Sequence, residues 1–125
     1  MKTALYLLAA LCLAACTPKH SPVADHIAVS GGGNIYYEEM GTGPAVILLH
    51  GHSLDTRMWD EQFPVFAQNH RTIRLDFRGY GRSSEQREDF QHTHADDVLT
   101  VMDSLGIDRA HIVGLSMGSF VAGDM

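Results

Sequence analysis

Three short strand-like runs set the hydrophobic pattern of the second half of the chain. Residues 45–49 are apolar throughout, which is typical of a strand that is buried on both faces of a parallel sheet. Residues 72–77 and 110–113 are predicted to be two further strands of the same sheet. The pattern therefore predicts a sheet whose centre is built from these three runs.

Apolar residues at helical spacing separate these runs. The aromatic residues between 59 and 66 predict a helical segment, which Pro64 kinks or divides into two short pieces. A second, amphipathic helix is predicted over residues 95–105, and Gly106 is expected to end it. Strands that alternate with helices in this way indicate right-handed βαβ units and an α/β fold.

Two β-rich segments precede the alternating part of the chain. Residues 27–30 and 34–40 predict an antiparallel hairpin, with the glycines of residues 31–33 in its turn. Three glycines also occur in phosphate-binding loops, but such loops lead into a helix, whereas a β-rich segment follows here. The predicted fold is a mostly parallel sheet with an N-terminal antiparallel hairpin.

The N-terminus has the pattern of an export signal. A lysine precedes the apolar run of residues 4–15, which is shorter than the roughly 20 residues that span a bilayer. The run ends in Leu-Ala-Ala-Cys at Cys16, which resembles the lipobox of bacterial lipoproteins. The resemblance implies that Cys16 carries a lipid and holds the exported protein to a membrane of the cell envelope. An ordinary secretory signal, which would give a periplasmic or secreted protein, is the alternative.

These features predict three regions. Residues 1–15 are expected to be the signal peptide, residues 16–25 a tether, and residues 26–125 the folded domain. The 125 residues are 45% hydrophobic and 19% charged, as in ordinary globular domains. The net charge of −6 argues against non-specific binding to nucleic acid. The expected partner is a small molecule.

The candidate chemistry lies at the end of the last predicted strand. The segment from Gly114 to Gly118 reads Gly-Leu-Ser-Met-Gly and fits the Gly-x-Ser-x-Gly nucleophile elbow, which lifts a serine Oγ into a cleft. Glycines without a Cβ allow the strand and the following helix to approach closely. A serine that merely caps the helix is the alternative interpretation of Ser116.

The order of the motifs resembles the N-terminal half of the α/β-hydrolase superfamily. His50-Gly51 follows one buried strand, the sequence Asp76-x-Arg78-Gly79-x-Gly81-Arg82-Ser83 follows the next, and an amphipathic helix and the elbow come afterwards. The resemblance covers residues 26–125 and is strongest to the lactonase, esterase and haloperoxidase-like branch.

This resemblance implies a set of site residues. Ser116 would attack an ester, lactone or related acyl carbonyl, and the backbone N–H groups of His52 and Met117 would hold the oxyanion. Gly114 and Gly118 would be the elbow glycines. The resemblance implies that His50 holds its loop in place, and it implies neither a cofactor nor a metal.

Two polar clusters invite other interpretations. Asp76, Arg78 and Arg82 are expected to satisfy the backbone of a tight loop rather than to act as acids and bases. His92 and His94, with Asp96 and Asp97, have the composition of a metal-ligand set. Residues two apart lie on different sides of a helix, so no metal site is expected there.

The family pattern places a catalytic acid and a histidine after the serine. After Ser116 the sequence contains one acid, Asp124, and no histidine. We therefore expect an incomplete hydrolase that is truncated after the elbow, folds poorly alone, leaves the elbow strand with a bare edge, and lacks turnover. The alternatives are a cofactor-free perhydrolase or carbon–carbon bond hydrolase, and a non-catalytic lipoprotein that binds a ligand on the same fold.

Overall fold

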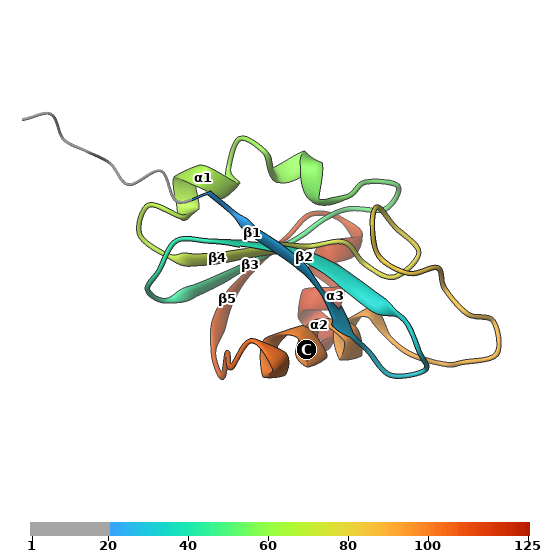
Figure 1. The fold of residues 1–125 in the computed structure, drawn as a ribbon. Coiled ribbons are helices and arrows are strands. Elements are labelled where there is room, and N and C mark those ends of the chain that lie inside the picture. Colours follow the sequence, from blue (N-terminus) through green and yellow to red (C-terminus); the bar gives the residue numbers. More distant parts are fainter. Residues whose placement is uncertain (1–20) are drawn as a thin grey trace, which may run out of the picture.

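A five-stranded mixed sheet forms the centre of the structure, a computed structural model in which residues 21–125 are described (Figure 1). Across the sheet the strands lie in the order β1-β2-β4-β3-β5. Their bounds are β1 Val23–Ala28, β2 Asn34–Met40, β3 Ala45–Leu49, β4 Arg71–Leu75 and β5 Ala110–Gly114. The apolar run at residues 45–49 is therefore the β3 strand, with a neighbour on each side.

The strand directions follow the predicted pattern. β3 runs parallel to β4 and to β5, with Leu49 opposite Leu75 on one side and opposite Gly114 on the other. β1 and β2 form the expected antiparallel hairpin, and the turn glycines have positive φ angles that residues with a Cβ rarely adopt. β2 also pairs antiparallel with β4. The predicted α/β fold with a mostly parallel sheet is confirmed.

Helices cover both faces of the sheet (Figure 1). Their bounds are a short 3-10 helix η1 at Thr56–Trp59, α1 at Phe63–Phe66, α2 at His94–Ser104 and α3 at Met117–Asp124. The alternation of side chains along β3 joins the layers. Ile47 and Leu49 pack in the cluster that contains residues of α2 and α3, whereas Val46 and Leu48 pack against Trp59 and Phe63.

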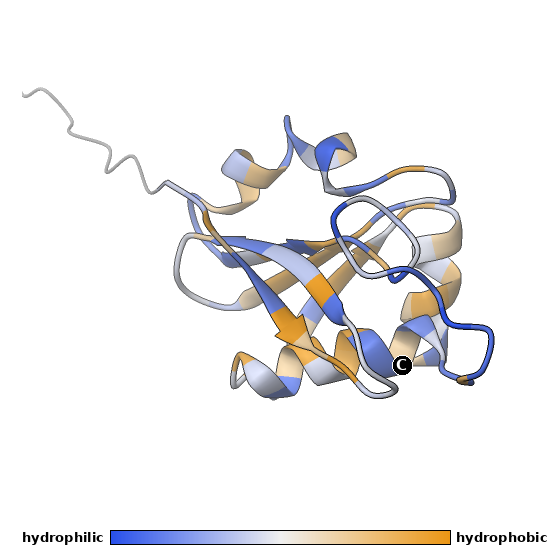
Figure 2. Ribbon diagram, turned by 45° about the vertical axis from the view of Figure 1, so that its right-hand side comes forward, coloured by the Kyte–Doolittle hydropathy of each residue, from blue (hydrophilic) through white to orange (hydrophobic). Residues whose placement is uncertain are grey.

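The predicted helical segment around Pro64 is divided into two short pieces, as expected. η1 ends at Trp59 and α1 begins at Phe63, with the proline in the first turn of α1. A proline is tolerated in the first turn because the N–H that it lacks would have no acceptor within the helix there. The loop from β4 to α2 is mainly hydrophilic (Figure 2).

The N-terminal boundaries need one correction. β1 begins at Val23, so the strand takes up the last part of the segment 16–25 that was predicted to be a tether. Pairing of Val23 with Glu39 extends the hairpin further toward the N-terminus than the apolar pattern indicates. The predicted signal peptide and Cys16 lie outside the described residues. Within residues 21–125, no helix combines the length and the apolar character needed to cross a membrane.

β5 is an edge strand. Among residues 21–125 it pairs only with β3, so its other edge is bare, as the sequence predicted. The side chain of Phe120 on the adjoining helix α3 is 75% exposed. The elbow region therefore borders an apolar surface that is open to solvent in this part of the chain.

Candidate active site

Three loops meet at one edge of the sheet because β3, β4 and β5 are parallel and end in register. The segment His50-Gly51-His52 follows β3, the glycine-rich loop beginning at Asp76 follows β4, and Ser116 follows β5. The backbone N–H of Leu115 donates to the carbonyl of Leu49 at 3.1 Å, which fixes the elbow against the end of β3. Ligands of open α/β sheets bind at this carboxyl edge of the strands.

Ser116 has the backbone of a nucleophile elbow. Its φ is 50° and its ψ is −114°, an uncommon conformation for a residue with a side chain. Such strain costs on the order of 1–3 kcal/mol and is found at functional sites. The residue is exposed at the N-cap of α3, but its side chain makes no cap hydrogen bond. This geometry favours the elbow over the helix-cap interpretation.

Both elbow glycines are required by close backbone contacts. A Cβ at Gly114 would overlap the backbone of Gly118, and a Cβ at Gly118 would overlap the carbonyl oxygen of Leu49. Neither neighbour is a flexible side chain that can move aside. The small residues therefore let α3 start directly behind β5 and beside β3.

His50 connects the β3 loop to the end of β4. Its Nε2 accepts a hydrogen bond from the Phe77 N–H at 3.0 Å, and its Nδ1 lies 2.7 Å from the carbonyl of Gly51. Because an N–H can only donate, Nε2 must be the acceptor, and the proton is therefore assigned to Nδ1. The ring is fully buried, and burial lowers its pKa. His50 is thus a neutral structural histidine, as the resemblance implied.

Tyr80 joins the two residues that the sequence selects for the oxyanion hole. Its hydroxyl lies 2.7 Å from Nδ1 of His52 and 3.7 Å from Sδ of Met117. Within residues 21–125, no hydrogen bond is found for the backbone N–H of His52 or of Met117. Sequence reasoning missed Tyr80. The position of Tyr80 between Gly79 and Gly81 marks a tight loop in the sequence, but it does not predict these contacts.

The comparisons with known proteins agree with this geometry. Residues 44–123 match the family described as alpha/beta hydrolase fold. The chain belongs to this family.

Three relatives of this α/β hydrolase illustrate the similarity. A putative non-heme chloroperoxidase of Synechocystis sp. is 36% identical over 88 residues, which cover 69% of this chain and 32% of the relative. Epoxide hydrolase B of Mycobacterium tuberculosis is 39% identical over 84 residues, 64% of this chain and 24% of the relative. The structure of Est816, an N-acyl homoserine lactone degrading enzyme, is 38% identical with a TM-score of 0.71, over 78% of this chain and 38% of that structure.

The chain spans less than two fifths of the length of each of these proteins. Its relatives include hydrolases of the same fold, which supports the expected class of protein. Since the relatives' names describe different reactions, the similarity alone does not select the chemistry of this α/β hydrolase.

The buried side chains of Asp76 and Arg78 hold the loop after β4, as the sequence predicted, whereas the side chain of Arg82 contacts Tyr36 and Glu38 of β2. Asp76 is buried, and its carboxylate accepts hydrogen bonds from the backbone N–H groups of Thr56 at 2.6 Å and Arg82 at 2.8 Å. Arg78 is fully buried and forms a two-pronged ion pair with Asp97, at 2.7 and 3.0 Å. These groups hold the loop and the start of α2 against the sheet.

The prediction that His92 and His94 lie on different sides of a helix is wrong. α2 begins at His94 and not before, and its N-cap Thr93 is extended, with φ −111° and ψ 153°. Side chains on either side of an extended residue point in the same direction, and residues three apart on a helix share a face. His92, His94 and Asp97 therefore lie together, with one possible ligand atom from each within 4.8 Å of the others.

No general base contacts Ser116 in the part of the chain that the structure describes. The Ser116 Oγ makes no hydrogen bond with any of residues 21–125, and His52 uses Nδ1 for its contact with Tyr80. A serine hydroxyl without a base is a poor nucleophile near neutral pH. The described residues thus supply an elbow but no partner that activates the serine.

Acid is expected to destabilise the protein below about pH 6.5 through His50. Its folded pKa lies below the ordinary value of 6.5, so between these two values the unfolded chain binds more protons than the folded chain. The free energy of unfolding contributed by His50 is therefore fully present above pH 6.5 and falls as the pH is lowered through this window. Thermal unfolding midpoints of the natively expressed protein across this range measure the effect.

A matched pair of variants compares His50 with an exposed histidine. His50→Gln should flatten the decline of the midpoint in this window, whereas His111→Ala, at an exposed position, should leave it unchanged. A midpoint that is constant, or that rises, as the wild-type protein is taken from neutral pH to acid would contradict the assignment.

Proposed function

We propose that this chain is the nucleophile-bearing part of a serine hydrolase that acts on a carboxylic ester, a lactone or a related acyl compound. The observation that carries the proposal is the strained backbone of Ser116, whose exposed side chain caps nothing. A conformation of this kind persists only where the surrounding structure enforces it, and the close contacts of Gly114 and Gly118 do so here.

The proposed reaction proceeds through a covalent acyl-enzyme. The Ser116 Oγ attacks the carbonyl carbon, its proton passes to a general base, and the alcohol departs when the tetrahedral intermediate collapses. The N–H groups of His52 and Met117 stabilise the oxyanion, with help from the positive N-terminal end of α3. Water then hydrolyses the acyl-enzyme and regenerates the serine.

This route needs a base that residues 21–125 do not place at Ser116. We therefore expect no measurable ester turnover from residues 1–125 alone, and we propose that turnover requires an acid and a histidine supplied from outside them. Loss of the base alone lowers the rate of such enzymes by several orders of magnitude.

Epoxide hydrolysis is disfavoured although several similar proteins are named as epoxide hydrolases. If the Ser116 oxygen opened an epoxide ring, the product would be an ether between enzyme and substrate. Water does not hydrolyse an ether under mild conditions, so the enzyme would be trapped after one event. The serine hydroxyl is regenerated when water cleaves the ester bond of an acyl-enzyme. This favours ester or lactone substrates.

A serine-reactive fluorophosphonate tests the proposal on the natively expressed protein. We expect one adduct in the intact mass, mapped to the peptide that contains Ser116. Ser116→Ala should abolish the adduct, whereas Ser104→Ala, at an exposed position on α2, should keep it. An adduct of equal yield in the Ser116→Ala variant would overturn the assignment of the nucleophile.

The same mass measurement addresses export and anchoring. We propose that residues 1–15 are removed and that Cys16 carries a lipid, which holds the protein to a membrane of the bacterial cell envelope. A mature mass that includes a diacylglycerol would support the anchor, and an unlipidated mass that begins at Cys16 would indicate a periplasmic or secreted protein. A mass of residues 16–125 plus lipid, with no fluorophosphonate adduct, would favour the non-catalytic binding lipoprotein.

A perhydrolase is the second candidate. The similarity to a protein named as a putative non-heme chloroperoxidase favours it. In that reaction hydrogen peroxide would replace water as the acceptor of the acyl group from Ser116. Peroxide-dependent formation of a peracid that exceeds ester hydrolysis by the same preparation would select this candidate.

A further inference from the structure

A cluster of His92, His94 and Asp97 lies at the start of α2. Asp97 belongs to the first turn of α2, and the two histidines flank the extended N-cap residue Thr93. One possible ligand atom from each of the three side chains lies within 4.8 Å of the other two. The two imidazole rings meet edge to face, with their centroids 6.1 Å apart.

Both histidines carry a ring nitrogen that the protein leaves unsatisfied. The Nδ1 atoms of His92 and His94 are buried and have no hydrogen-bond partner within residues 21–125. The His92 side chain is only 5% exposed, and its Nε2 faces the Asp97 carboxylate at 3.8 Å. Burying a polar atom without a partner costs free energy, so such atoms call for an explanation. Two such atoms therefore lie in one cluster of side chains of types that bind metals.

We propose that His92, His94 and Asp97 bind a divalent transition-metal ion such as Zn²⁺. Two imidazoles and one carboxylate form a set that Zn²⁺ accepts, with room for water at the remaining position. Metal–ligand bonds of about 2.0–2.2 Å place ligand atoms roughly 3.3 Å apart at tetrahedral angles. The three ligand atoms therefore have to approach one another by about 1.5 Å at most.

A neighbouring side chain orients one of the proposed ligands. Arg78 holds the Asp97 carboxylate through two hydrogen bonds and fixes its orientation. Groups that orient a metal ligand in this way are a usual part of metal sites.

Arg78 also sets a limit on affinity. Its guanidinium lies on the carboxylate that would bind the ion, and its charge repels a second cation. Each carboxylate oxygen still has a lone pair beside the one used by Arg78, so Asp97 can contact both groups. The proposed site is therefore expected to bind the ion with moderate affinity, unlike a structural zinc site.

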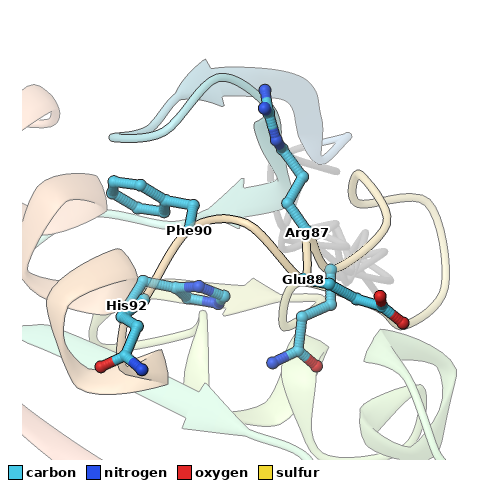
Figure 3. A pocket seen from close by; sticks show the side chains of 6 residues that line it. Arg87, Glu88, Phe90 and His92 are labelled. Atoms are coloured by element: carbon cyan, nitrogen blue, oxygen red, sulfur yellow. The ribbon is translucent and has the colours of Figure 1, made fainter.

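A cavity borders two of the three proposed ligands. It has a volume of about 350 Å³, and His92, Asp96 and Asp97 are among the residues that line it. His92 also lines a neighbouring cavity of about 500 Å³, where its ring lies beneath the ring of Phe90 (Figure 3). The Phe90 and His92 rings are nearly parallel, with their centroids 6.1 Å apart.

The bound ion would tie the first turn of α2 to the loop that precedes it. His92 lies in that loop, and His94 packs against Phe77 at the end of β4, with ring centroids 4.8 Å apart. The ion is expected to stabilise this part of the fold, since an ion that binds only the folded state raises the free energy of unfolding by mass action. The proposal is independent of the reaction at Ser116.

Titration of the purified, natively expressed protein with Co²⁺ and Zn²⁺ after treatment with a chelator tests the site. We expect one ion per chain, visible Co²⁺ absorption that Zn²⁺ displaces, and a higher unfolding midpoint with either metal. His92→Asn and His94→Phe should each weaken binding by about 10-fold or more, because even changes behind a ligand cost about 10–100-fold. His111→Ala removes an exposed histidine from β5 and should bind the metals as the wild type does.

Either of two results would overturn the proposal. One is the absence of stoichiometric Co²⁺ binding by the wild-type protein. The other is metal binding that is unchanged in the His92→Asn variant. This variant is the sharper test because His92 precedes α2, so its replacement does not change a residue of the helix. Circular dichroism of each variant identifies a loss of folding, and labelling of Ser116 by the fluorophosphonate reports on the active site separately.

Discussion

Arg78→Leu is expected to lower the free energy of unfolding by about 3–5 kcal/mol, the usual cost of removing one partner of a buried ion pair. Arg78 is fully buried, and the Asp97 side chain that it neutralises is 3% exposed. Without the guanidinium, the carboxylate stays buried next to the core of α2 with no countercharge. Arg78 also donates to the carbonyl of Ser30 at 3.0 Å, a bond that leucine cannot replace. Urea unfolding of the natively expressed protein measures the change.

An exposed ion pair supplies the matched control. Arg87 pairs with Asp89, and their side chains are 52% and 70% exposed. Arg87→Leu should therefore leave the free energy of unfolding nearly unchanged. The double variant Arg78→Leu/Asp97→Leu should lose less stability than the sum of its single changes, because the unpaired charge is removed as well. Equal effects of Arg78→Leu and Arg87→Leu would show that burial of the pair contributes nothing.

Gly118→Ala is expected to destabilise the protein by about 1–3 kcal/mol and to reduce fluorophosphonate labelling of Ser116. The added Cβ would overlap the carbonyl oxygen of Leu49 and lie 2.8 Å from that of His50, so either α3 or the end of β3 must move. Both shifts displace the loop that carries His52 relative to the elbow. Unfolding midpoints and the rate of adduct formation measure the two effects.

The control for this change lies on the same helix. A Cβ at Gly123 would have no atom within 4 Å, and the residue has no positive φ. Gly123→Ala should therefore be neutral or stabilise the protein by up to about 1 kcal/mol through helix propensity, with labelling unchanged. If Gly118→Ala had the same effects as Gly123→Ala, close packing at the elbow would not be the reason for a glycine at position 118.

The local pattern of the sequence was sufficient for most elements of the fold. Residues 45–49 are apolar at every position because β3 has a strand on each side and helices on both faces, and such a strand favours apolar side chains. Pro64 and Gly106 mark helix boundaries through their own backbone preferences, which do not depend on distant residues. The elbow was predictable for the same reason, since its glycines and serine meet a local geometric demand.

Contacts between distant segments were beyond the sequence pattern. Tyr80 meets His52 and Met117 only because three parallel strands end at one edge of the sheet. The start of β1 at Val23 depends on pairing with Glu39, which no periodicity within the strand reveals.

The sequence by itself determined the α/β class, the order of the elements and the position of the candidate nucleophile. These features follow from periodicity and from the backbone preferences of glycine and proline, which act over a few residues. The tertiary structure decided that Ser116 is strained and uncapped, that His50 is a buried structural group, and that His92, His94 and Asp97 share one site. Each of these depends on where a helix begins or on which loops meet, and that is set by packing of the whole sheet rather than by neighbouring residues.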